Sequence, residues 1–258
     1  MIYPAEISKL SYRLNIADKI IEKDYVLTWL LIGLSNTNLK DEIVFKGGTA
    51  IRKAYFRNYR YSQDLDFTLV TKSSDKEILA GFEKIYSQMN ELAAIPARFN
   101  RKEEGVEGSL TFYVNYSGPL GASIERNEIK IDVTKDEVLL FPPESKSLFQ
   151  EYSDQKSQVI LKVYSLEEIV VEKLCSLLDT ARSEPRDVYD TWFLLNSGNI
   201  DLDFLENWFS QKCTFKKMNP ENLKAQLDKK EPLYKRLWEI RLRDQLPKLS
   251  YLKLFIVS

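Results

Sequence analysis

The pattern of apolar and polar positions predicts a buried helix and then a strand near the start of the chain. Residues 18–34, DKIIEKDYVLTWLLIGL, place apolar side chains at helical spacing, which predicts a long and largely buried helix. The run EIVF that follows is short, β-branched and aromatic, and it stops at Gly47-Gly48, as a strand that enters a tight turn does. Thr49 is expected to cap a helix that runs to about Asn58.

Further segments alternate with the period of a strand. Residues 64–70, DLDFTLV, form the first, and Asp64 and Asp66 are two positions apart, so their side chains project from the same face. Residues 110–116 and 128–134 form two more strands, which are predicted to pair in one sheet. In the last of these strands isoleucine and valine alternate with polar residues, so its polar face carries Asp132, where it could join Asp64 and Asp66.

The second half of the chain is predicted to be mainly helical. Pro142-Pro143 breaks the strand pattern, and a domain transition is expected near residues 150–164. The expected division is a core of residues 1–155, with a helix over 76–96 beside the strands, and a helical domain of residues 156–258. Together they predict an α+β fold with a mixed sheet flanked by helices.

The helical half begins with a recognisable signal. Ser165 is followed three residues later by Glu168, which is typical of a capping box at the start of a helix. In that helix Lys173 falls inside the apolar stripe, where an unpaired charge would be costly. Lys173 is therefore expected either to extend its ammonium group to water or to meet an anion.

Composition narrows the possible chemistry. The chain has no histidine, which excludes Ser-His-Asp and Cys-His catalysis and histidine-ligated metals and leaves carboxylates, Lys, Arg, hydroxyl groups and hard cations. Cys175 and Cys213 lie far apart without a CxxC pattern, so neither a disulfide framework nor a zinc site is indicated. No signal peptide or membrane-length apolar run is present, and a cytoplasmic protein without a membrane partner is expected.

Charge is unevenly distributed along the chain. The formal net charge is −1, yet residues 212–258 hold twelve Lys or Arg against five Asp or Glu. This basic region is either a surface for a phosphate backbone or a set of solvated lysines. The same two alternatives apply to five cations between residues 46 and 60, interleaved with tyrosine and phenylalanine: Lys46, Arg52, Lys53, Arg57 and Arg60.

Two short motifs indicate phosphate chemistry. The backbone N–H groups of Gly47, Gly48 and Thr49 could bind the β- and γ-phosphates of a nucleoside triphosphate, although a plain turn would also explain the two glycines. Asp64 and Asp66 repel each other unless water or a cation lies between them, and Mg²⁺ prefers one or two carboxylates together with substrate phosphates. With Asp132, this set could hold two ions.

The whole arrangement resembles the active-site signature of the polymerase-β-like nucleotidyltransferase superfamily. More closely it resembles the AbiEii/AbiGii family of bacterial toxins, with the MenT-like toxins, through FKGGTAIRKAY, RYSQDLDF, IEKDYVLTWLL and EEIVVEKLCSLLDTARSEPRDVYD. The resemblance covers most of residues 20–195. It departs from the family at Glu184, where relatives commonly carry lysine.

The resemblance implies roles for individual residues. Asp64, Asp66, Lys173 and Asp187 are the expected catalytic residues. Asp64, Asp66 and Asp132 are the expected ligands of Mg²⁺, with Mn²⁺ as the alternative. The expected nucleotide-binding residues are Gly47, Gly48, Thr49, Arg52, Ser62, Lys173 and Arg186. The helical domain is expected to complete the active-site cleft. From the sequence alone, Arg186-Asp187 could instead be an ion pair at a helix start.

The resemblance also implies a function. It implies a toxin of a toxin-antitoxin or phage-defence (abortive infection) system that moves a nucleoside monophosphate from an NTP to the 3′ end of tRNA, releases pyrophosphate and blocks translation. A cognate antitoxin encoded nearby is the implied partner. The alternatives are a nucleotidyltransferase acting on a protein or small molecule, and a catalytically silent module that binds NTP.

Overall fold

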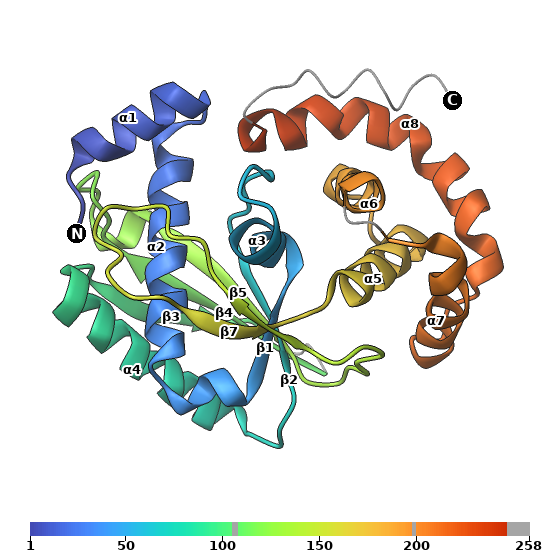
Figure 1. Cartoon of the computed structure of the whole chain (residues 1–258), viewed down its shortest axis with the longest axis horizontal. Helices are drawn as coiled ribbons and strands as arrows, with labels where there is room; N and C mark the ends of the chain where they lie inside the picture. Colours follow the sequence, from blue (N-terminus) through green and yellow to red (C-terminus); the bar gives the residue numbers. More distant parts are fainter. Residues whose placement is uncertain (105–107, 198–199, 247–258) are drawn as a thin grey trace. The chain divides into compact units, whose positions relative to one another are not determined.

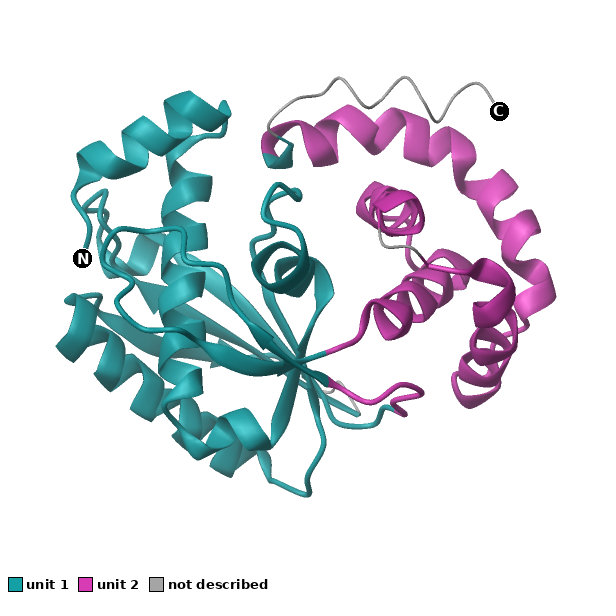
Figure 2. Cartoon of the chain, in the orientation of Figure 1, with its two compact units in different colours: residues 1–137, 144–163, 245–258 teal, residues 138–143, 164–244 magenta. Residues whose placement is uncertain are grey.

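A computed structural model describes residues 1–104, 108–197 and 200–246. The chain forms two compact units (Figure 2). Unit 1 comprises residues 1–137 and 144–163 and the chain from Gln245 onward, and unit 2 comprises residues 138–143 and 164–244. The chain therefore leaves unit 1 for the helices of unit 2 after residue 163, whereas the sequence pattern places the domain boundary after residue 155.

Unit 1 is built on one mixed sheet of seven strands in the order β3-β4-β5-β2-β1-β7-β6 (Figure 1). The strands are β1 (Ile43–Lys46), β2 (Leu65–Leu69), β3 (Ala97–Lys102), β4 (Ser109–Tyr116), β5 (Glu128–Thr134), β6 (Glu144–Ser147) and β7 (Ile160–Val163). Neighbouring strands are antiparallel except for the parallel pairs β2–β5 and β1–β7. The strands predicted at 64–70, 110–116 and 128–134 are thus confirmed.

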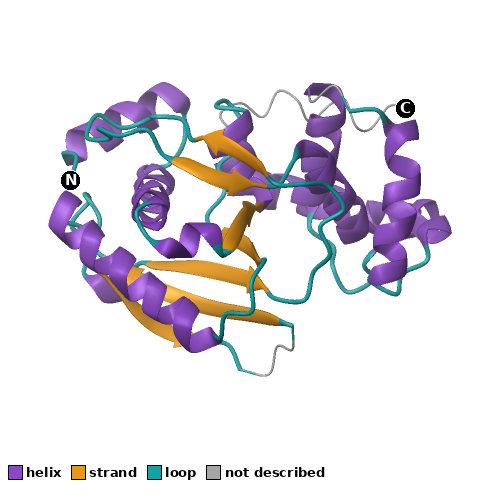
Figure 3. Cartoon of the chain, turned by 60° about the horizontal axis from the view of Figure 1, so that its bottom comes forward, coloured by secondary structure: helices purple, strands orange, loops and turns teal. Residues whose placement is uncertain are grey.

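Helices accompany the sheet in unit 1 (Figure 3). The helices are α1 (Pro4–Leu14), α2 (Asp18–Ser35), α3 (Gly47–Ala50) and α4 (Asp75–Ala93), with short 3₁₀ helices η1 (Asn38–Asp41) and η3 (Ile124–Arg126) and a π-helix η2 (Ile51–Tyr55). The apolar face of the sheet packs on α4, because Phe82 of α4 lies edge-on to Phe67 and Phe112 of the strands. The polar face of β5, which carries Asp132, is the opposite face.

Helix α2 is buried on nearly all sides. Fourteen of its 18 residues are buried, as its continuous apolar run predicts. Gly33 allows it to approach α4, because a Cβ at this position would lie 2.6 Å from Cγ2 of Ile85. Two charged residues within this helix, Glu22 and Asp24, are also buried and need partners inside the protein.

Unit 2 is a helical bundle, as the second half of the sequence predicts. Its helices are α5 (Leu166–Leu178), α6 (Pro185–Ser197), α7 (Leu202–Phe215) and α8 (Leu223–Leu242), with a 3₁₀ turn η4 (Pro220–Asn222), and η5 (Arg243–Gln245) follows α8. Cys175 and Cys213 pack together in its apolar core as free thiols. None of the helices in the described part of the chain combines the length and the apolar character that crossing a membrane requires.

Only one of the two hydrogen bonds of the capping box predicted at Ser165 forms. The Ser165 hydroxyl oxygen accepts a hydrogen bond from the backbone N–H of Glu168 at 3.2 Å. The Glu168 carboxylate does not return the bond; it accepts from the backbone N–H groups of Leu140 and Phe141 and pairs with Lys212 at 2.8 Å. Tertiary partners are available to this buried carboxylate, and they override the local motif.

Candidate active site

The Gly-Gly-Thr turn follows directly on β1. Gly47 has a φ of +80°, a conformation that favours glycine. A Cβ at Gly47 would lie 2.2 Å from Oδ2 of Asp66, so the Asp66 carboxylate occupies the space beside the turn. At Gly48 a Cβ would lie 2.7 Å from Nη2 of Arg60 and 3.1 Å from Oγ of Ser62. A side chain at either position would therefore have to displace a neighbouring polar side chain.

Thr49 does not cap the following helix, which corrects the sequence-based prediction. The helix begins two residues earlier, at Gly47, and the helical stretch ends at Tyr55 rather than Asn58. The Thr49 hydroxyl donates to the backbone oxygen of Asp64 at 2.6 Å. Thr49 thus ties the turn to the segment that carries the first aspartate.

The sheet register brings polar residues of four strands into one row. Lys46 of β1 pairs with Asp66 of β2, Asp66 pairs with Asp132 of β5, and Asp132 pairs with Thr111 of β4. Lys46 also reaches Thr134 of β5, since its Nζ donates to Oγ1 at 3.0 Å. Asp66 and Asp132 therefore lie side by side, as the alternation predicts.

The Asp132 side chain has partners of its own. It accepts a hydrogen bond from the Thr111 hydroxyl at 2.5 Å and pairs with Lys130 at 2.8 Å. Within the described ranges, no three acidic or cysteine side chains converge closely enough to form a metal-binding group. Asp64 and Asp66 are both half-buried and remain accessible to a cation. The donor set of aspartate oxygens beside a glycine turn fits the hard cation Mg²⁺.

Lys23 of α2 is a residue of this region that sequence reasoning missed. Burial lowers the pKa of Lys23, and the charges of Asp64 and Glu128 oppose that effect without cancelling it. The charge of Lys23 therefore acts on the first aspartate of the pair. The signal in the sequence is the charged run Glu22-Lys23-Asp24 within an otherwise apolar helix.

Replacing Gly47 with alanine should lower any transferase activity roughly a hundredfold, because the new Cβ would displace the Asp66 carboxylate by an ångström or more. The matched control is Gly121→Ala, which also places alanine at a positive φ, +76°, but with nothing within 4 Å of its Cβ. Both variants should lose stability from the backbone strain, by about 1–2 kcal/mol. Equal activities of the two variants in a turnover assay would show that Gly47 and Asp66 are not coupled.

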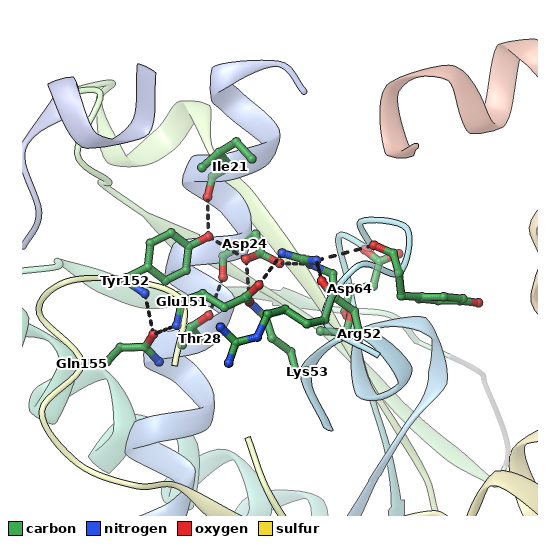
Figure 4. A network of polar contacts seen from close by, with 12 residues as sticks. Ile21, Asp24, Thr28, Arg52, Lys53, Asp64, Glu151, Tyr152 and Gln155 are labelled. Carbon is green, nitrogen blue, oxygen red and sulfur yellow. Dashed lines mark hydrogen bonds and ion pairs between the residues drawn. The ribbon is translucent and has the colours of Figure 1, made fainter. Parts of the chain in front are cut away.

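Arg52, predicted to bind nucleotide, lies in a buried ion-pair network (Figure 4). Its Nε contacts Asp24 of α2 at 3.2 Å and its Nη2 contacts Glu151 at 2.7 Å. Lys53 contacts the same two carboxylates, at 2.5 and 2.7 Å. Tyr152 completes the network by donating to Asp24 at 2.6 Å. Both cations are buried and paired with carboxylates, so neither belongs to a solvated basic face.

Arg60 is also interior. It is 3% exposed, and its Nη1 donates to the side-chain oxygen of Gln245 at 2.8 Å. Ser62 is 7% exposed beside it. Because both lie against Gly48, these two residues limit the space beside the backbone of the turn.

Unit 2 contains a second group of expected site residues. Lys173 of α5 pairs with Asp187 at 2.8 Å and with Asp190 at 2.7 Å, both on α6. Arg182 also contacts Asp187, at 2.5 Å. Burial raises the pKa of Asp187, but Lys173 and Arg182 lower it more, so the carboxyl is held below its usual pKa. Lys173 thus meets anions, one of the two outcomes expected from its place in the apolar stripe.

Arg186 does not pair with Asp187. It contacts Glu184 at 3.4 Å, and Glu184 also lies 4.0 Å from Arg241 of α8. The acid at position 184, which departs from the family pattern, is thus joined to two arginines. Pro185 is the first residue of α6, where it needs no N–H partner.

We expect Lys173→Met to make the stability of the protein strongly dependent on pH. Without the ammonium group, the folded-state pKa of Asp187 and Asp190 should rise, because both are buried and both lose the cation that they share. A raised carboxyl pKa destabilises the fold above that pKa, so the loss relative to the parent should be larger at pH 8 than at pH 5. Urea unfolding at both pH values measures this, and a loss independent of pH would contradict it.

Two lysines of the basic C-terminal region are not on the surface. Lys212 is fully buried and pairs with Glu168 at 2.8 Å and Glu172 at 2.9 Å. Lys230 is 5% exposed and donates to the backbone oxygens of Leu177 and Asp179. The net charge of this region therefore overstates the positive charge that it presents to a partner.

Comparisons with known proteins place this chain among nucleotidyltransferases. The family described as "Nucleotidyl transferase AbiEii toxin, Type IV TA system" matches residues 29–253. Among curated proteins, none matches the sequence of this chain.

Two solved structures from Helicobacter pylori have a similar fold. JHP933 is 17% identical, covers 92% of this chain and 99% of its own, and has a TM-score of 0.50. Another structure, described as a candidate nucleotidyltransferase, is 19% identical, covers 83% of this chain and 84% of its own, and also has a TM-score of 0.50.

Proposed function

Because this chain belongs to the AbiEii family of nucleotidyltransferase toxins, we propose that it moves a nucleoside monophosphate from an NTP to the 3′ end of tRNA and so blocks translation. The observation that carries the proposal is the Asp66 carboxylate packed against the Gly47 turn at the end of β1. Phosphates bound by the turn would lie beside the carboxylate that holds their cation. The NTP and tRNA substrates favour the cytoplasm as the place of action.

In this proposal Asp64 and Asp66 hold Mg²⁺, with Mn²⁺ as the alternative, and Asp132 stands beside Asp66 in the sheet. The metal would supply a Lewis acid for the α-phosphate. The backbone N–H groups of the turn at Gly47, Gly48 and Thr49 hold the β- and γ-phosphates. Arg60 and Ser62 fix the turn, so the nucleotide meets a site that is already formed.

The proposed transfer forms one bond and breaks one. The oxygen of the acceptor hydroxyl bonds to the α-phosphorus, and the bond from that phosphorus to the β-phosphate oxygen breaks, which releases pyrophosphate. The hydroxyl proton passes to a carboxylate, for which we propose Asp132. Thr111 and Lys130 orient this side chain.

Lys173 is proposed to offset the negative charge on the phosphates during transfer. Asp187 and Asp190 favour the charged form of its ammonium group and fix its position. Arg186, joined to Glu184, is proposed to contribute to nucleotide binding from the same loop and helix.

A toxin of this family implies an antitoxin partner. The acceptor is a separate question from the partner. Lys212 and Lys230 are buried, so the basic C-terminal region presents less positive charge to RNA than its composition indicates. This observation favours an acceptor of another class, a protein or a small molecule, as the second candidate. A module that binds NTP without turnover is the third possible outcome of the test.

The test is to incubate the purified protein with total bacterial tRNA, Mg²⁺ and each α-labelled NTP in turn, with and without a chelator. Labelled RNA on a denaturing gel, lost with the chelator, would support the proposal and identify the nucleotide. Label on protein or a small molecule would support the second candidate. Tight binding of Mg-NTP without any labelled product would overturn the proposed transfer.

A further inference from the structure

Unit 1 contains a pocket that the proposed transfer does not use. It has a volume of about 160 Å³ and is lined by the last turn of α1, residues 57–61 and residues 150–152. Cavities of about 150 Å³ hold a ligand the size of benzene, so a single small group fits here. Arg52 lines the pocket and also contacts Asp24, which is not among the lining residues.

Two residues that line the pocket, Arg52 and Glu151, belong to an electrically balanced ion-pair network. Asp24 and Glu151 carry two negative charges, and Arg52 and Lys53 carry two positive charges, all joined within 3.2 Å. Arg52 also donates to the backbone oxygen of Arg57 at 2.7 Å, and its Cζ lies 3.8 Å from the centre of the Tyr61 ring. Because each of its three guanidinium nitrogens donates a hydrogen bond, Arg52 is a preorganised part of the wall.

Two further arginines give the pocket an excess of positive charge. Arg13 of α1 and Arg57 both line it and are both exposed. Across the residues that the structure describes, neither forms an ion pair, although the Cζ of Arg57 lies 5.0 Å from the centre of the Phe149 ring. Since Asp24, Lys53, Arg52 and Glu151 cancel, these two guanidinium groups leave a net charge of about +2 at a pocket that fits a small group.

We propose that this pocket binds a phosphate group carried by a nucleotide, with Arg13 and Arg57 as its ligands. Guanidinium groups bind phosphate oxygens through paired charge-assisted hydrogen bonds, and a small tetrahedral anion suits both the charge and the volume. The phosphate could belong to a free nucleotide or to an RNA strand. The proposal does not rest on the transfer to tRNA, because phosphate binding here needs neither metal nor turnover.

The test follows the arginine Nε–H signals by NMR without divalent metal, during titration with inorganic phosphate, adenosine monophosphate, adenosine and a short single-stranded RNA. Phosphate should shift the signals of Arg13 and Arg57, and Arg13→Gln or Arg57→Gln should each weaken its binding roughly tenfold or more. The matched control is Arg98→Gln on β3, an exposed arginine outside the pocket, which should not change the affinity.

Each outcome decides the proposal. Tighter binding of RNA than of adenosine monophosphate, lost in both variants, would identify a strand phosphate. The reverse order would identify a free nucleotide. The proposal is overturned if phosphate leaves the signals of Arg13 and Arg57 unshifted, if adenosine shifts them equally, or if both variants bind phosphate as tightly as the parent.

Discussion

Replacing Asp66 with alanine should lower nucleotidyl transfer by about a thousandfold or more while the protein stays folded. A metal ligand beside the phosphates contributes several kcal/mol to a phosphoryl transfer, and about 4 kcal/mol corresponds to a thousandfold in rate. The fold should tolerate the change, because Asp66 is only half-buried and its carboxylate is crowded against Gly47. Binding of the NTP without metal should change much less than the rate.

The measurement is the initial rate of label transfer by the variant and its parent at saturating NTP, with circular dichroism as a check of the fold. Asp41→Ala is the matched control, because Asp41 precedes β1 but is exposed and lies 3.8 Å from Lys162 in a loose ion pair. Full activity of Asp66→Ala would remove Asp66 from the metal site. A loss of activity equal to that of Asp41→Ala would do the same.

Asp24→Asn should lower the free energy of unfolding by roughly 3–5 kcal/mol, the cost of leaving buried cations without their partner. Asp24 is 1% exposed and contacts Arg52, Lys53 and Tyr152. Asparagine keeps the shape but removes the charge, so two cations in the interior would share only Glu151. Urea unfolding at neutral pH measures the loss.

Lowering the pH should remove the stability that Asp24 contributes to the parent protein. Burial raises the pKa of Asp24, but Lys53 and Arg52 lower it more, so its folded-state pKa lies below the usual value. The stability that it contributes is therefore present at neutral pH and is lost as the pH falls through that lowered pKa. The difference between parent and variant should shrink accordingly in acid.

Two controls keep this prediction testable. Asp18→Asn, at the start of the same helix, should cost less than about 1 kcal/mol, because the residue is only half-buried and accepts one bond from Ser8. The double variant Asp24→Asn/Lys53→Met should be less destabilised than the sum of the two single variants, since it removes both partners. Additive losses would show that Asp24 and Lys53 do not interact.

The strands and the aspartate row could be predicted from the sequence because alternation is a local property. The alternation in residues 128–134 predicts a strand with Asp132 on its polar face. Asp132 then lies beside Asp66 if the two strands pair, and the register of β2 and β5 confirms that they do. The apolar run of residues 18–34 likewise predicted a buried helix.

The positions of Arg52 and Lys53 could not be predicted in this way. Their partner Asp24 lies 28 and 29 residues away and Glu151 lies 99 and 98 residues away, so no local pattern joins them. The sequence did hold a signal: a charged run within a helix that is apolar on every side requires buried partners. The Glu168 carboxylate shows the same effect, because its partners at residues 140, 141 and 212 are distant in the chain.

The contact between Gly47 and Asp66 makes the two positions dependent on each other during evolution. With the carboxylate in place, a side chain at position 47 would have to displace it, as the distance of 2.2 Å shows. Once Asp66 is lost, its carboxylate no longer restricts position 47, and glycine is favoured there only by the positive φ. In a lineage that loses catalysis, substitution of the aspartate should therefore relax the steric constraint at position 47, where only the constraint from the positive φ would remain.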